Sequence, residues 1–172
     1  MAKIKPGTIY EIMLDIEKYV YVCRFNEFEL GLFDIVSKIQ LGIDAIKDKN
    51  IIDYKSVTFI DKLNKLKDEK QVRNKWKKVG EIDVNDFKYP DVAVFNPWKQ
   101  ELSYENCEIL KGWRGPKLKV SLEEYKKIME AGLWDGTIDN FILYERYISR
   151  NIDNIINNKP LEPGGEITSF GL

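Results

Sequence analysis

The sequence predicts an α+β fold: a mainly antiparallel, curved sheet or partly open β-barrel with two C-terminal helices. Between residues 7 and 119, short runs rich in β-branched and aromatic residues alternate with turn signals such as Gly115-Pro116. From residue 121 onward, apolar residues recur at the spacing of an amphipathic helix. We therefore expect one domain over residues 1–156, β-rich over 7–119 and helical over 121–156. An irregular tail is expected over 157–172.

The expected strands follow from composition, and the first two make a hairpin. Residues 8–13 have strand composition, 15–18 form a turn, and 19–25 are β-branched or aromatic almost throughout. The third strand contains Gly31, which predicts a bulge or a close backbone approach. This third strand is expected over 28–36, and further strands are expected at 51–60, 75–82, 91–95 and 107–111. Helical spacing within 62–74 predicts a short helix.

The helical part begins with a capping signal. Ser121 followed by Glu124 is a capping box, in which the serine accepts a hydrogen bond from the glutamate amide. This predicts a first helix over about 121–131. Asp135-Gly136 interrupts the apolar stripe, which then predicts a second helix over about 137–156.

Composition narrows the function classes. The 172 residues include no histidine and two cysteines, Cys23 and Cys107. Catalysis that depends on histidine is therefore excluded, and zinc has too few suitable ligands. No phosphate-binding glycine loop is present. We expect no catalytic residues, no cofactor and no metal.

The same composition predicts where the protein works. The start of the chain lacks an apolar run of the signal-peptide type, and no stretch is long enough to cross a bilayer. We expect a soluble, cytoplasmic protein without a membrane partner. Cys23 and Cys107 are then expected to be buried, reduced thiols, although neighbouring strands would allow them to pair.

Candidate partner-binding residues lie in loops. Trp98, Trp113 and Arg114 stand in segments rich in glycine and proline, which can present large side chains outward, and tryptophan and arginine often carry binding energy. The alternative is that both indoles fold back and close one end of the barrel. Trp76 and Trp134 are expected to be mostly buried.

The segment Lys62–Lys78 is rich in lysine, and it suggests a second function. A small β-barrel could bind nucleic acid through this segment, with Trp76 as a stacking platform. The net charge of −1 makes nucleic acid an improbable partner, because the chain as a whole is not basic. A solvated lysine-rich segment and core packing of Trp76 are the plainer interpretations.

Five ordered motifs give the chain a family outline: Pro6–Ile12, the run 19–25, Phe33-Asp34, Lys75–Ile82 and Ala131–Asp135. Together they resemble the immunity protein 26 family of bacterial polymorphic toxin systems over roughly residues 5–150. The resemblance implies a β-rich domain that binds a cognate protein toxin and neutralises it, without enzymatic activity. It implies no catalytic or ligand residues in this chain.

Overall fold

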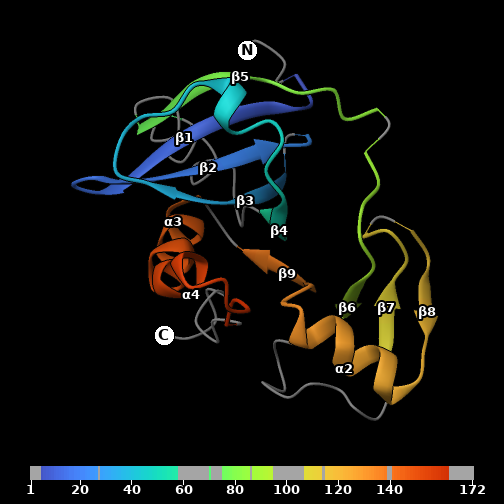
Figure 1. Cartoon of the computed structure of the whole chain (residues 1–172). Coiled ribbons are helices and arrows are strands. Elements are labelled where there is room, and N and C mark those ends of the chain that lie inside the picture. Colours follow the sequence, from blue (N-terminus) through green and yellow to red (C-terminus); the bar gives the residue numbers. More distant parts are fainter. Residues whose placement is uncertain are drawn as a thin grey trace.

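The computed structural model describes residues 5–26, 28–57, 70, 75–85, 87–94, 107–113, 115–138 and 141–162, with the side chains of 134–137 left aside. Its strands form one nine-stranded sheet in the order β5-β1-β2-β3-β4-β9-β6-β7-β8. Figure 1 shows the first five of these strands above the helices α3 and α4, and β6–β8 beside α2. The predicted α+β class is confirmed, and the sheet is open rather than closed into a barrel.

The first half of the sheet is an antiparallel meander extended by one strand. Four of its strands follow one another in the chain, and β5 pairs on the outer side of β1. Their bounds are β1 Thr8–Asp15, β2 Lys18–Arg24, β3 Glu29–Ser37, β4 Ile51–Val57 and β5 Trp76–Glu81. The expected close approach at Gly31 is present. A Cβ there would lie 2.8 Å from side-chain atoms of both Phe25 and Ile51.

The second half is a three-stranded antiparallel unit, and β9 joins it to the first. The unit consists of β6 Val92–Val94, β7 Glu108–Leu110 and β8 Lys117–Lys119. Strand β9, Trp134–Ile138, pairs in parallel with β4 on one side and with β6 on the other. Both parallel pairings in the described sheet involve β9, so the sheet is mainly antiparallel, as predicted.

The helix predicted over 121–131 is α2, Leu122–Glu130. The Ser121 side chain accepts a hydrogen bond from the Glu124 amide at 3.2 Å, as the capping signal predicted. Tyr125 is the fully buried residue of its apolar stripe, and its hydroxyl donates to the carbonyl of Val94 at 2.9 Å. This bond fixes α2 against the end of β6.

The prediction of one continuous helix over 137–156 was wrong in two respects: where the helix begins, and that it is unbroken. Residues up to Ile138 belong to β9, and the helical region is divided into α3, Phe141–Arg150, and α4, Ile152–Ile156. Ile138 falls at helical spacing from Phe141 and Ile142, but its pairing with Val57 of β4 holds it in an extended conformation. Of the predicted tail, residues 157–162 contain no helix or strand, and Leu161 packs into the core with 4% exposure.

The first half of the sheet buries both of its faces. Alternating residues of β1 and β2 divide between two apolar clusters: Ile12, Val20 and Val22 face α3 and α4, whereas Ile9, Tyr21 and Cys23 face the opposite side. The segment after β3 covers that opposite side, with Leu41 and Ile43 packed against it. It includes the short 3₁₀ helix η1, Ile43–Ala45.

The two cysteines are buried and free, as expected. Cys23 lies in the cluster covered by the segment after β3, while Cys107 lies in the cluster covered by the helices. Burial raises the pKa of the Cys23 thiol to about 12, which keeps it protonated and unreactive at neutral pH.

Candidate functional site

Trp113, expected as an outward binding residue, is buried. The side chain has 4% exposure and lies against Tyr54 and Phe25, with ring centroids 5.2 and 6.0 Å away. Trp113 lies in a tight turn with φ 57°, and its indole packs inward among these aromatic rings. The outward orientation is therefore corrected, and the alternative of an indole folded back into the core describes Trp113.

Several other sequence predictions fall on residues outside the described ranges. They include Trp98, Arg114, the Trp134 side chain and Lys62–Lys78 apart from Lys70 and 75–78. Trp76 is described and is 3% exposed, which confirms core packing. Its indole N–H donates to Glu145 of α3 at 2.7 Å, and its ring meets Phe141 edge-on with a centroid distance of 5.1 Å. Trp76 therefore offers no free face on which a nucleobase could stack.

The described lysines beside Trp76 are engaged with polar partners. Lys75 lies 3.5 Å from a Glu145 carboxylate oxygen, and Lys78 lies 2.6 Å from Glu81. Lys77 donates to the Gln40 side chain at 3.1 Å. Such contacts contribute little to stability, but the two glutamates offset part of the positive charge that this end of the lysine-rich segment presents.

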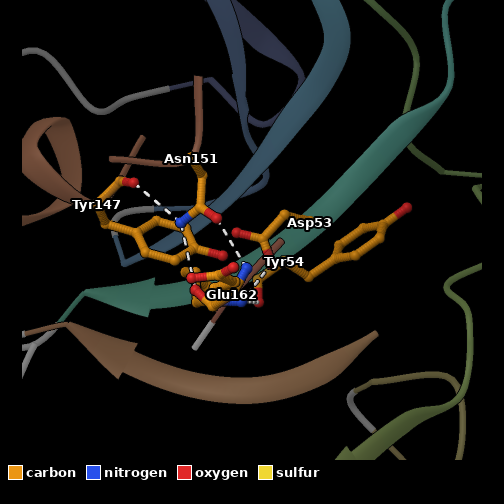
Figure 2. Close-up of polar contacts among 6 residues, drawn as sticks. Asp53, Tyr54, Tyr147, Asn151 and Glu162 are labelled. Carbon is orange, nitrogen blue, oxygen red and sulfur yellow. Dashed lines mark hydrogen bonds and ion pairs between the residues drawn. The ribbon is translucent and has the colours of Figure 1, made fainter. Parts of the chain in front are cut away.

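A polar cluster lies buried between β4 and the helices. Asp53 and Lys55 stand two residues apart on β4, so both side chains point to the face that α3 and α4 cover. They form an ion pair with 1% and 0% side-chain exposure. The Lys55 ammonium also lies over the Tyr147 ring of α3, 5.4 Å from its centroid. Figure 2 shows Tyr54 pointing away from this cluster, as strand alternation requires.

Asn151 extends the cluster to the end of the described chain (Figure 2). Its amide nitrogen donates to the carbonyls of Tyr147 and Glu162, each at 3.2 Å, and its amide oxygen accepts from the Glu162 backbone N–H at 2.7 Å. Asn151 occupies the break between α3 and α4 with 3% exposure. It therefore ties residue 162 back onto the helix pair.

Burial governs the titration of this cluster. It raises the pKa of Asp53 above its ordinary value, while the charge of Lys55 and its hydrogen bond act in the opposite direction. Burial also holds the pKa values of Tyr144 and Tyr147 well above the usual range, and the nearby Asp53 charge adds to this. Because the helices enclose these groups, the cluster positions α3 and α4 on the sheet rather than facing a substrate.

Three of the large exposed apolar residues lie close to one another at one end of the sheet. Met13, Ile16 and Ile39 are 59%, 84% and 68% exposed, and we call them the hairpin-end surface. In the sheet register Met13 pairs with Tyr19, and Tyr19 pairs with Ser37, so all three apolar residues lie at one end of the sheet. Figure 1 shows the β1–β2 turn and the segment after β3 at this same end.

The local backbone holds these side chains outward. Asp15 pairs with Lys18, which leaves Ile16 and Glu17 as a two-residue turn, and Glu17 has φ 60°. Asparagine and glycine are the usual residues in such turns, and a non-glycine residue in the left-handed region costs roughly 1–2 kcal/mol. Ile39 sits in a serine turn, where the Ser37 hydroxyl bonds both the amide and the carbonyl of Ile39.

Sequence reasoning assigned residues 15–18 to a turn but did not select Ile16 as a binding residue. The signal was present: a β-branched apolar residue and a glutamate fill a turn where glycine or asparagine is favoured. Breaks in a local rule of this kind tend to fall at functional sites.

Other features of the described residues give weaker indications of a binding site. A cleft of about 330 Å³ is lined by Asp34, Glu130 and Lys159 among others. Within the described ranges, no three carboxylates or thiols lie close enough together to hold a metal ion. No helix in that part of the chain is long and apolar enough to span a bilayer.

No family model matches the chain, and comparisons with curated proteins and with solved structures likewise found no match.

Proposed function

We propose that this chain is an immunity protein that binds a cognate protein toxin through the hairpin-end surface and neutralises it by contact, without catalysis. The observation that carries the proposal is the outward presentation of Ile16, 84% exposed, by a strained two-residue turn. Three large exposed aliphatic side chains at one end of a rigid sheet are suited to an apolar pocket on a partner. The resemblance to the immunity family supplies the class of partner.

The charges around the surface favour a protein over a lipid partner. Asp15 and Glu17 flank Ile16, and Lys18 and Lys38 follow close by in the same end of the sheet. Mixed charges around an apolar centre match the polar rim of a protein interface. The acidic side chains beside Ile16 would be repelled by an anionic membrane.

The test uses the toxin domain encoded in the neighbouring gene. Co-expression of this chain is expected to protect cells from that domain, and the purified proteins are expected to form a one-to-one complex. Ile16→Asp should weaken binding at least about 30-fold, because a hot-spot residue contributes more than about 2 kcal/mol. Isothermal titration calorimetry measures the affinity, and the melting temperature should stay within a degree or two of the parent.

A matched control separates the surface from hydrophobicity in general. Ile156 on α4 is also exposed, at 53%, but it lies outside the hairpin-end surface. Ile156→Asp should leave toxin binding unchanged. The proposal fails if the parent pair neither associates at micromolar concentration nor protects cells. Titration with generic DNA and RNA at two salt concentrations covers the nucleic-acid alternative, which requires affinity that falls steeply with salt.

A further inference from the structure

Strand β8 ends the nine-stranded sheet at the edge opposite β5. Among the described strands it pairs with β7 alone, and its three residues, Lys117, Leu118 and Lys119, are all exposed. An edge strand carries backbone N–H and C=O groups that can pair with another extended chain. The register between β7 and β8 shows which backbone groups of β8 point away from the sheet.

Two flanking hydrogen bonds settle which residues of β8 point outward. The Val120 N–H donates to the Cys107 carbonyl at 2.9 Å, and the Lys111 N–H donates to the Pro116 carbonyl at 3.1 Å. In an antiparallel pair, hydrogen-bonded and non-hydrogen-bonded positions alternate. The backbone groups of Leu118 therefore point toward β7. Those of Lys117 and Lys119 point away from the sheet, where they can receive a further strand.

The side chains indicate what that strand would carry. Lys117 and Lys119 lie on one face of β8, and Glu108 of β7 faces them: it pairs with Lys119, and its carboxylate lies 3.5 Å from the Lys117 ammonium. Strand β7 thus already places an acid against this lysine pair. On the other face, Leu118 is 43% exposed and has room for an apolar neighbour.

We propose that β8 is a strand-addition site for an extended protein segment in which acidic residues alternate with apolar ones. The acids pair with Lys117 and Lys119 across the new strand junction, and the apolar residue covers Leu118. A second copy of this chain is a poorer occupant, because pairing β8 with β8 brings lysines against lysines. This site is separate from the hairpin-end surface and does not depend on the proposed function.

The other sheet edge lacks these properties. The pairing of β5 with β1 shifts between Ile9 and Tyr10, so a bulge interrupts the alternation of outward groups along β5. Bulges of this kind protect an edge from further pairing. Strand β8 is short, but its described register is regular.

The test uses two terminally blocked seven-residue peptides, one alternating glutamate with valine and the other alternating lysine with valine. The parent protein should bind the glutamate peptide at least about 10-fold more tightly, measured by NMR shift changes at up to millimolar peptide. Lys119→Glu should reverse the preference between the two peptides. Slowed amide exchange at residues 117 and 119 should locate the bound strand on β8.

Proline separates strand addition from simple charge attraction. Lys119→Pro removes one outward N–H without breaking a bond to β7, so the fold is kept and the affinity for the glutamate peptide should fall at least about 10-fold. Lys119→Gln is the matched control: it removes the same charge, keeps the N–H, and should bind more tightly than Lys119→Pro. Equal binding of both peptides by the parent overturns the proposal. Equal affinity of the Pro and Gln variants also overturns it, as does a dimer of the parent that Lys119→Pro dissolves.

Discussion

Individual residues of β4 show how context overrides a local rule. Asp53 and Lys55 lie in a strand whose alternation would suit a solvated polar face, yet both are buried beneath α3 and α4. Each charge is tolerated because the other lies beside it and the Tyr147 ring covers Lys55. Loss of either partner would leave a buried charge without compensation.

Lys55→Met is expected to destabilise the protein by about 3–5 kcal/mol at neutral pH, because Asp53 remains buried without its cation. Urea unfolding measures the loss. Replacing both residues, Asp53→Leu with Lys55→Met, should recover most of it. Lys47→Met is the control: it breaks the exposed pair with Asp44, and should leave the urea midpoint close to that of the parent. Similar effects of Lys55→Met and Lys47→Met would contradict a stabilising role for the buried pair.

The pH dependence of this variant has a definite sign. Burial raises the folded-state pKa of Asp53, and removal of Lys55 raises it further. A folded-state pKa above the unfolded value means that protonation favours folding. This stability is present below the unfolded pKa and is lost as the pH rises through the folded pKa. The deficit of Lys55→Met relative to the parent should therefore shrink toward acid pH.

At the scale of elements, Trp76 links β5, the strand at one edge of the sheet, to α3, which comes much later in the chain. Its ring packs on Phe141, and its indole N–H reaches Glu145, so β5 and α3 are fixed to one another. The same side chain thus contributes apolar burial and one hydrogen bond to a carboxylate. The two contributions can be separated by substitution.

Trp76→Ala should cost about 3–5 kcal/mol, as expected for deletion of a buried aromatic ring. Trp76→Phe keeps an aromatic ring but removes the donor to Glu145, and should cost about 1.5–3 kcal/mol. Chemical denaturation gives both values. A Trp76→Ala variant that unfolds at the parent's midpoint would show that the burial of Trp76 does not stabilise the fold.

At the scale of the whole molecule, the core crosses the junction between the two halves of the sheet. One apolar cluster contains Val20 of β2 together with Ile109 of β7, and the other contains Phe25 together with Trp113. The halves share these contacts in addition to the pairings of β9. This arrangement favours a single cooperative unit.

Both halves are therefore expected to unfold in one transition. Hydrogen exchange followed by mass spectrometry across a urea series should give the same midpoint for peptides from β2 and from β7. Earlier loss of protection in β6–β8 would instead divide the chain into two domains.

Much of the fold could be predicted from sequence because its signals are local. The β-branched and aromatic composition of residues 19–25 specifies a strand, and Ser121 with Glu124 specifies a helix start. Strand β9 could not be recognised, because it is short and its conformation depends on neighbours from distant parts of the chain. The direction of Trp113 also depends on tertiary packing, which residue type does not reveal.

The position of β9 has a consequence for biosynthesis. Strands β4 and β6 have both been made before β9, yet they lie on either side of it in the sheet. The ribosome releases the chain from its N-terminus, so the meander β1–β4 can assemble early from contacts between sequence neighbours. The sheet cannot become continuous until residue 138 has emerged. Completion of the fold is therefore a late event that joins two preformed pieces across a long sequence separation, and this non-local closure should set the pace of maturation.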